Sequence, residues 1–349
     1  MGSPMRLATF QPQLGVHCET TTLRNMLHHA GADISEPMLF GLGQGIDFQY
    51  WDAPDPGRST PMLTGRIGPA LLSRNACAAL GVALRESRAP DAESARAAAA
   101  KLLDAGHVVG MSVDIFHLDY FSSRSHFASH YIALYGLDGS LAHVVDTDQQ
   151  GGAQTLPEES LRRARASDEG FMPTPNLQMY VEPLPARLTV DTDAVLREQI
   201  WPAILLTARR MAGASGPRFG LDALRRAASE IAAWSDTLAC ADETVQGVGR
   251  FWRFAGTGGA NFRTLYHAFL LEARHRSGDS ELDPFVADFD AVRQRWDQAI
   301  EMLTAYRGGD AGRRQLQAVA AQLHAIADAE QSLFERLLVP AAKRAGEPT

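Results

Sequence analysis

The sequence predicts an α+β protein in which a cysteine-bearing helix packs on an antiparallel sheet, followed by an all-α helical domain. Two observations carry this prediction. Up to a Pro-rich stretch at 173–185, short runs rich in Val, Ile and Tyr alternate with segments that have helical periodicity. Beyond Arg187, the long segments carry apolar residues three and four apart, which is typical of helices in a bundle. We therefore expect two domains, residues 1–187 and 188–349.

The elements of the first domain follow from their start and stop signals. Glu19 and the three threonines after it cap a helix that begins at Cys18 and ends near Gly31. An Asp138–Gly139 turn joins two strands as a hairpin. The expected strands are 46–51, 107–113, 130–137, 141–145 and 178–182. The expected helices are 18–31, a short one whose start signal is Ser35, Glu36 and Pro37, 69–80 and 91–105, and residues 52–65 are expected to form a loop.

The second domain shows a simpler pattern. Its expected helices are 191–211, 221–234, 261–276, 285–306 and 315–338. The clearest apolar stripe joins Phe262, Tyr266 and Phe269, and we interpret it as core packing. The Gly-rich residues 256–261 could bind a phosphate through backbone amides. Their spacing matches neither a P-loop nor a dinucleotide-binding motif, so we expect a tight turn between helices.

Composition excludes several classes of function. The 349 residues carry a net charge of -8 without a cluster of Lys and Arg, so we expect no nucleic-acid partner. No run approaches the roughly 20 apolar residues of a membrane span. Cys18, Cys77 and Cys240 are too few for a disulfide framework and lack zinc-binding spacing, so a reducing cytoplasm is the expected location. The oligomeric state stays open, with a homodimer as one alternative.

Cys18 is the candidate nucleophile. Its sulfur is expected beside the unpaired amide groups of the first helical turn, where the positive end of the helix dipole favours a thiolate. A thiolate is the form of cysteine that attacks an acyl carbon. The alternative is a small, buried, apolar cysteine, which is common near a helix start.

His130 and Asp146 extend this candidate to a set of three. His130 opens one arm of the hairpin and Asp146 follows the other, so the two residues are expected to be cross-strand neighbours. A histidine can take the thiol proton and return it to the leaving group, while an acid orients the imidazole. We therefore predict a Cys18–His130–Asp146 triad. The alternative is that His130 is a buried strand residue and Asp146 a turn residue.

An attacked carbonyl also needs a hydrogen-bond donor for its developing oxyanion. The backbone amide of Cys18 is one donor, and a side-chain amide just upstream is the expected second. We place it at Gln13, with Gln11 as the alternative. His126 and His130 have the i, i+4 spacing of a helical metal site, but their segment indicates a strand and no third ligand stands out, so no metal is predicted.

Several of these residues resemble those of a known family. The stretch from Gly15 to Cys18, the glycine-rich segment ending at Gly45, His130 and Asp146 together resemble the N-terminal domain of the butirosin biosynthesis protein H family. The segment from 252 to 266 is similar to the helical domain that often follows it. The resemblance implies a papain-like cysteine-enzyme fold that carries out acyl transfer.

The resemblance also implies a substrate class. The expected reaction is amide-forming transfer of an acyl or aminoacyl group from the phosphopantetheine thioester of an acyl or peptidyl carrier protein to a small-molecule amine, in natural-product biosynthesis. No intrinsic cofactor is expected, because the phosphopantetheine arm arrives with the substrate. The aromatic and polar composition of residues 114–129 suits a substrate-facing loop. The expected substrate-binding residues are His17, Gln44, Asp114 and Tyr120. A thioesterase or cyclase with the same triad and a non-catalytic carrier-binding protein are the alternatives.

Overall fold

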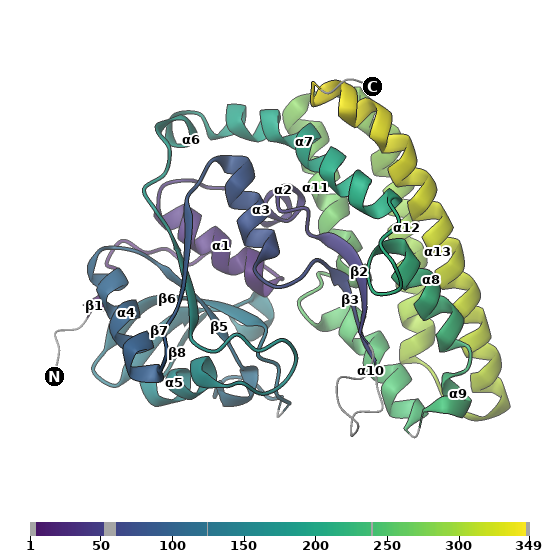
Figure 1. The fold of residues 1–349 in the computed structure, drawn as a ribbon, viewed down its shortest axis with the longest axis horizontal. Helices are drawn as coiled ribbons and strands as arrows, with labels where there is room; N and C mark the ends of the chain where they lie inside the picture. The colour runs from purple at the N-terminus through teal and green to yellow at the C-terminus, as the bar shows by residue number, and fades with distance from the viewer. Residues whose placement is uncertain (1–4, 52–60, 124, 239, 347–349) are drawn as a thin grey trace. The chain divides into compact units, whose positions relative to one another are not determined.

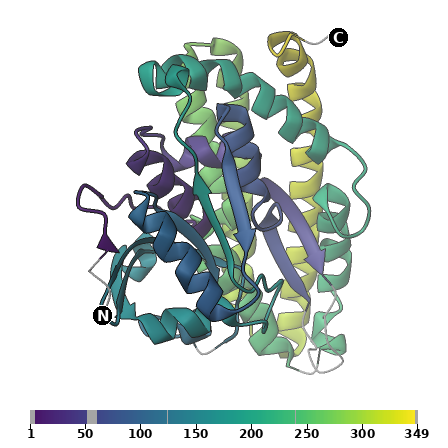
Figure 2. The ribbon, with the colours of Figure 1, turned by 60° about the vertical axis from the view of Figure 1, so that its left-hand side comes forward.

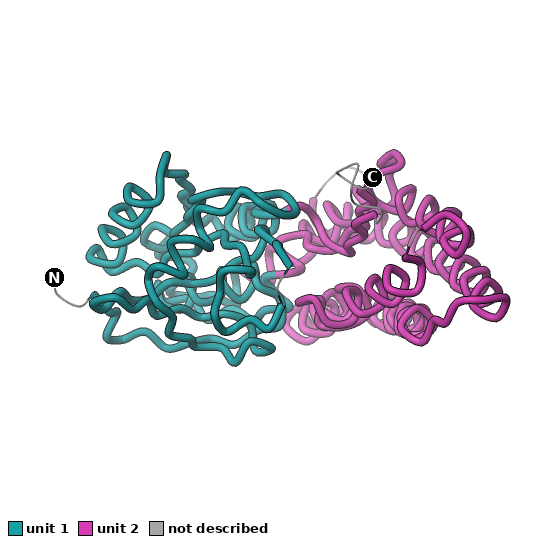
Figure 3. Tube along the Cα trace, turned by 90° about the horizontal axis from the view of Figure 1, so that it is seen from below, with its two compact units in different colours: residues 1–39, 69–195 teal, residues 40–68, 196–349 magenta. Residues whose placement is uncertain are grey.

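The computed structural model describes residues 5–51, 61–123, 125–238 and 240–346. The chain divides into two compact units, one made of residues 1–39 and 69–195 and the other of 40–68 and 196–349 (Figure 3). Residues 40–68, which the sequence analysis places with the first domain, thus cluster with the second unit. The expected boundary at 187 lies close to the point after Val195 where the chain enters the second unit for the last time.

The first unit is built on an antiparallel sheet, as the sequence predicts. Its strand order is β4-β9-β5-β6-β7-β8, and β1 pairs with β6. The strands are β1 (Met5–Arg6), β4 (Leu84–Arg88), β5 (Val109–Val113), β6 (His130–Asp138), β7 (Leu141–Val145), β8 (Ala153–Pro157) and β9 (Leu177–Val181). Strands β1, β4 and β8 were not predicted. β1 has two residues, and β4 and β8 are short edge strands with many polar residues, which weakens the apolar alternation.

Helices cover both faces of this sheet (Figures 1 and 2). Helix α1 (Cys18–His29) packs on β5, β6 and β9. Gly110 of β5 permits this approach, because a Cβ atom there would lie 2.9 Å from Thr22 of α1. The neighbouring Val109 and Met111 point to the other face by strand alternation, into a core with α4 (Ala92–Asp104) and α5 (Glu158–Ala166).

The remaining elements of the first unit are short. They are α3 (Leu71–Leu80), α6 (Ala186–Val190), the 3-10 helices η1 (Ile115–His117) and η2 (Asp148–Gln150), and the first residues of α2 (Glu36–Leu42) and α7 (Thr192–Ala212). Asp91 caps α4 by accepting a hydrogen bond from the Ser94 amide. The helices expected at 69–80 and 91–105 are therefore present, whereas α5 was not predicted.

The β6–β7 hairpin sets the register of the candidate site. Asp138 pairs with Leu141, so the turn falls one residue later than the sequence suggests. A bulge at Tyr135 then shifts the pairing, and beyond it Ala133 pairs with Val145. Extending this register places Asp146 opposite Ile132 and diagonal to His130, a separation that longer side chains can span.

The second unit is a helical bundle with one β-hairpin. The hairpin strands are β2 (Ile46–Trp51) and β3 (Met62–Arg66). Strand β3 lies partly where the sequence predicts a loop, and residues 52–60 of that loop lie outside the described residues. Besides α7, the helices are α8 (Gly220–Ile231), α9 (Trp234–Thr237), α10 (Ala241–Phe254), η3 (Ala260–Phe262), α11 (Arg263–Ser277), η4 (Ser280–Leu282), α12 (Asp283–Thr304) and α13 (Gly309–Arg344). All five expected helices are present, and α10 was missed.

A buried ion pair joins the bundle to its hairpin. Arg263 Nε and a terminal nitrogen of its guanidinium each donate to a carboxylate oxygen of Glu330 over 2.8 Å, and both side chains are fully buried. Arg263 also donates to the backbone oxygens of Asp47 in β2 and Gly65 in β3. Trp296 donates to Glu330 over 2.8 Å. The hairpin is therefore an integral part of the core of the second unit.

The expected turn at 256–261 is closed to solvent at its key residues. Thr257, Ala260 and Asn261 are fully buried, and the Thr257 hydroxyl donates to the Trp252 carbonyl over 2.8 Å. Their burial supports a tight connection between α10 and α11. None of the helices among the described residues has the length and apolar character that a transmembrane segment requires.

Candidate functional site

Cys18 is the first residue of α1, as the sequence predicts. The preceding residue, His17, has extended backbone angles and gives no side-chain cap to the helix. Cys18 is half-buried, whereas Cys77 is buried. Its backbone amide belongs to the first turn, whose N–H groups lack carbonyl partners within the helix. This position can therefore offer both a sulfur nucleophile and an amide donor.

Glu36 fixes the backbone in front of the cysteine. Its carboxylate accepts hydrogen bonds from the amides of Val16 and His17, each over 2.8 Å, and from the Thr20 hydroxyl over 2.7 Å. Burial raises the pKa of Glu36, and these hydrogen bonds oppose that rise. Sequence reasoning used Glu36 only as a helix-start signal. Its role in holding the approach to Cys18 depends on tertiary contacts that no local pattern reveals.

His130 and Asp146 meet in the structure, in the register that follows the bulge of the hairpin. His130 Nε2 lies 2.9 Å from Oδ1 and 2.8 Å from Oδ2 of Asp146. The Asp146 side chain is fully buried, and that of His130 is 9 % exposed. Because Asp146 engages Nε2, the ring atom left for Cys18 is Nδ1.

Two further groups hold the Asp146 carboxylate. The Tyr120 hydroxyl donates to Oδ2 over 2.9 Å, and the Thr147 amide donates to Oδ1 over 2.6 Å. Burial raises the pKa of Tyr120 well above its ordinary value, and the charge of Asp146 raises it further, so Tyr120 stays a neutral donor. We expected Tyr120 to bind substrate; this stays a prediction, and in the structure its hydroxyl donates to Asp146.

The electrostatic surroundings favour a protonated His130. Burial alone lowers the pKa of its imidazole, but the charge of Asp146, the charge of Cys18 and hydrogen bonds to both side chains raise it to about 10. At neutral pH both ring nitrogens are therefore protonated, and His130 is a cation. The edge of Phe121 packs against it, with ring centroids 5.2 Å apart at 81°. A cation enclosed in this way is suited to stabilise a neighbouring thiolate.

Asp114 organises the loop that carries Tyr120 and Phe121. Its Oδ1 accepts from the Phe127 amide over 2.9 Å, and its Oδ2 lies 2.6 Å from His126 Nδ1. Burial alone raises the pKa of Asp114, but these hydrogen bonds and others outweigh it and hold that pKa below its ordinary value. Asp114 is fully buried. Its observed contacts fix the two ends of the loop, and its expected role in binding substrate stays a prediction.

Gln13, the expected second oxyanion donor, is held against α1 by its backbone. Asn25 accepts from the Gln13 amide over 2.9 Å and donates to the Gln13 carbonyl over 2.8 Å. Asn25 lies seven residues after Cys18, which is a rise of about 10 Å along the helix. The Gln13 side chain donates to the Gln11 carbonyl over 3.3 Å. The assignment of the second oxyanion donor to Gln13, with Gln11 as the alternative, stays a prediction.

The other two expected substrate-binding residues lie in different units. His17 is buried in the first unit, and its Nδ1 lies 3.1 Å from the Thr20 hydroxyl. Gln44 belongs to the second unit, where its backbone carbonyl accepts from Arg210 over 2.7 Å and its side chain over 3.3 Å. The nearby Gly41 has a packing role, because a Cβ atom there would lie 2.1 Å from the Phe269 ring.

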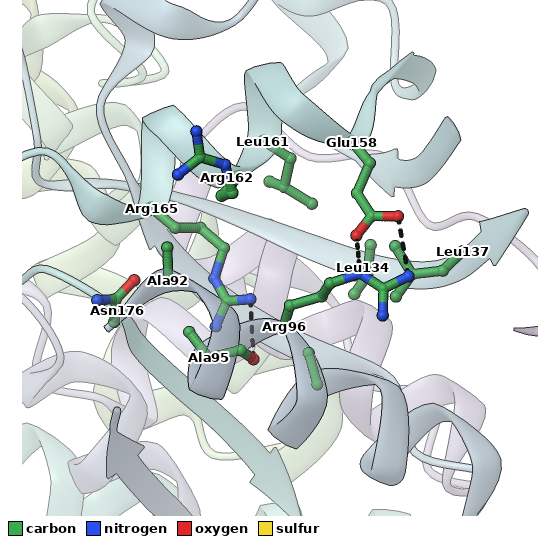
Figure 4. Close-up of a pocket in the computed structure, with 11 residues that line it drawn as sticks. Ala92, Ala95, Arg96, Leu134, Leu137, Glu158, Leu161, Arg162, Arg165 and Asn176 are labelled. Carbon is green, nitrogen blue, oxygen red and sulfur yellow. Dashed lines mark hydrogen bonds and ion pairs between the residues drawn. The ribbon is translucent and has the colours of Figure 1, made fainter. Parts of the chain in front are cut away.

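A small pocket between α4 and α5 is separate from these residues (Figure 4). Arg165 lines it and is buried, and it donates to the Ala95 carbonyl and to Gln178. Burial lowers the pKa of Arg165 to about 10. Arg96 and Glu158 form an ion pair in the wall of this pocket. Its lining contains none of the predicted site residues.

Two family models match the chain. The family model described as "Butirosin biosynthesis protein H, N-terminal" matches residues 17–147, which include Cys18, His130 and Asp146. The model described as "Domain of unknown function (DUF4872)" matches residues 159–337. A comparison with curated proteins gave no match. The first match points to secondary-metabolite biosynthesis of the butirosin type. The chain belongs to the butirosin biosynthesis protein H-like family, in which the N-terminal domain is followed by the helical domain of unknown function.

Proposed function

We propose that the protein is a cysteine-dependent acyltransferase with a papain-like catalytic domain. It takes an acyl or aminoacyl group from a carrier-protein thioester and forms an amide with a small-molecule amine. The observation that carries this proposal is the buried His130–Asp146 pair. Cys18, at the start of α1, interacts with the imidazole of this pair through its charge and a side-chain hydrogen bond. The cytoplasm is the proposed location, which fits three cysteines without disulfide bonds.

The first half-reaction uses the protonated state of His130. The Cys18 thiolate attacks the thioester carbonyl and forms a new C–S bond, while the Cys18 amide stabilises the oxyanion. The tetrahedral intermediate then expels the phosphopantetheine thiolate, which takes the proton of the imidazolium. The products are an acyl-Cys18 enzyme, neutral His130 and a free carrier thiol. A thiolate leaving group needs little acid assistance, so thioesters suit this site better than amides.

The second half-reaction needs His130 as a base. Acylation removes the charge of Cys18, which is one of the contributions that raise the pKa of His130. The imidazole therefore becomes easier to deprotonate once the acyl group is bound. An amine attacks the acyl-enzyme and gives its proton to His130, and the Cys18 thiolate leaves. Asp146 keeps the imidazole oriented in both half-reactions, and Tyr120 in turn positions Asp146.

Intact-protein mass spectrometry tests the proposal. The full chain is mixed with carrier proteins loaded with a panel of aminoacyl and short acyl phosphopantetheine thioesters. We expect the mass of one acyl group on the wild type and on Cys240→Ser, which removes an exposed thiol, and none on Cys18→Ala. If no donor acylates the wild type, or if Cys18→Ala is acylated equally well, the covalent mechanism is wrong.

The released product then identifies the acceptor. Addition of amines to the acyl-enzyme should discharge it with formation of an amide. Release of the free acid would indicate a thioesterase, and release of a ring would indicate a cyclase. Carrier binding without an adduct on any variant would favour a non-catalytic binding protein.

A further inference from the structure

A second cluster of potential metal ligands lies beside the candidate site. One ligand atom each of Asp114, His117 and His126 lies within 4.8 Å of the other two. The sequence analysis predicted no metal because the pair His126 and His130 lacked a third ligand. The structure brings His126 to Asp114 and His117 instead. Two imidazoles and a carboxylate form a donor set that Zn²⁺ and related divalent ions bind in proteins.

The carboxylate of Asp114 has one oxygen suited to a metal. Oδ1 accepts hydrogen bonds from two backbone amides, of Phe116 over 3.1 Å and of Phe127 over 2.9 Å. Oδ2 lies 2.6 Å from His126 Nδ1 and accepts from the Ser167 hydroxyl over 2.7 Å. The bonds to Oδ1 therefore fix the carboxylate, while Oδ2 and Nδ1 of His126 share the proton of a hydrogen bond. A divalent ion would replace that proton.

The spacing of the two rings is close to that of a shared ion. The ring centroids of His117 and His126 are 5.9 Å apart. Two imidazoles bound tetrahedrally to one zinc at about 2.0–2.1 Å have centroids about 5.2 Å apart. The 2.6 Å gap between Oδ2 and Nδ1 must open to about 3.3 Å, the edge of such a tetrahedron. The ligand atoms now lie within 4.8 Å of one another, so the His117 ring must also move towards the other two to reach the same edge of about 3.3 Å.

The other nitrogen of His126 already has a partner of the kind that metal-binding histidines use. Its Nε2 lies 3.2 Å from an oxygen of Glu169. Metal-bound histidines usually donate their second N–H to a carboxylate, which fixes the tautomer and the ring orientation. Gly170 makes this contact sterically feasible, because a Cβ atom there would lie 2.6 Å from the His126 carbonyl oxygen.

We propose that Asp114, His117 and His126 bind one divalent transition-metal ion of the Zn²⁺ class, with Glu169 orienting His126. The ion would tie together both ends of the loop whose middle holds Tyr120 against Asp146 and Phe121 against His130. Metal binding is thereby linked to the packing around His130. The test of this site is independent of the proposed acyl transfer, since binding is measured without any substrate.

Titration with Co²⁺ tests this site in the full chain. We expect one equivalent to bind and to give visible d–d absorption, and Zn²⁺ to displace it. The His117 ring packs against the rings of Phe116 and His126, so His117→Ala should lower the affinity at least tenfold without unfolding the protein. Glu169→Gln should lower it about 10–100-fold. His324→Ala, which removes an exposed imidazole of α13, is the matched control and should bind as the wild type does.

Three results would overturn the proposal. The first is absence of stoichiometric Co²⁺ or Zn²⁺ binding at micromolar concentrations. The second is wild-type affinity in His117→Ala. The third is a sulfur-to-cobalt charge-transfer band that disappears in Cys18→Ala, because the metal would then be bound by the cysteine. Whether Cys18 accepts an acyl group is measured separately by mass spectrometry, so this proposal and the proposed function can fail separately.

Discussion

Replacing Asp146 by Asn tests the electrostatic basis of the candidate site. The substitution keeps the size of the side chain and removes its charge, which is the largest contribution that raises the pKa of His130 to about 10. We expect that pKa to fall towards its ordinary value of 6.5. At pH 7.5 the imidazole is almost fully protonated in the wild type, whereas a histidine with the ordinary pKa is about 9 % protonated. The population of thiolate paired with imidazolium should therefore fall by up to about tenfold.

Alkylation of Cys18 by iodoacetamide measures this population without any substrate, because the thiolate is the reactive form. At pH 7.5 we expect the rate for Asp146→Asn to be about tenfold below that of the wild type. Asp148→Asn, which changes an exposed aspartate two residues further on, is the matched control.

Titration of the His130 ring by NMR provides the direct readout of its protonation. Equal alkylation rates in the wild type and Asp146→Asn, within about twofold, together with an unmoved His130 titration, would refute the electrostatic role of Asp146.

Three further predictions concern stability and positioning. Folding raises the pKa of His130 from 6.5 to about 10, so the stability that its protonation provides is complete below pH 6.5 and is lost as the pH rises through about 10. Urea unfolding of the wild type should show this loss of stability, and Asp146→Asn should show a smaller loss. Tyr120→Phe removes a hydrogen bond but no charge, so acylation should slow by up to about tenfold while the His130 titration stays in place. Glu330→Gln leaves the buried Arg263 without a counter-charge and should cost about 3–5 kcal/mol in urea unfolding, whereas Glu335→Gln on the exposed side of α13 should cost little.

The sequence predicted which residues form the candidate site better than it predicted how they meet. The helix start at Cys18 and the strand start at His130 follow from local patterns. A hairpin with Asp138 opposite Leu141 and no bulge, however, would place Asp146 opposite Ala133, on the other face of the sheet from His130. The bulge at Tyr135 corrects this by one residue. No spacing rule predicts such a bulge, because it depends on how the whole sheet packs.

Tertiary contacts account for the other differences. Strand β2 was predicted, but it clusters with the second unit. There the buried Arg263, which is distant in sequence, donates a hydrogen bond to its backbone. Glu36 appeared only as a helix-start residue, and its contacts with the backbone before Cys18 span about 20 residues. Tyr120 lies in an aromatic loop whose composition suggested substrate binding. Its bond to Asp146 depends on Asp114, which holds the ends of that loop.

The measurement that tests the central claim most directly is mapping the site of acylation by peptide mass spectrometry. The wild type is exposed to an acylated carrier protein, digested, and searched for the acyl mass on each of its three cysteine peptides. We predict the modification on Cys18, with Cys77 and the exposed Cys240 unmodified, and its loss in His130→Ala. An acyl group found on Cys240 instead, or full product formation by Cys18→Ala, would contradict the account.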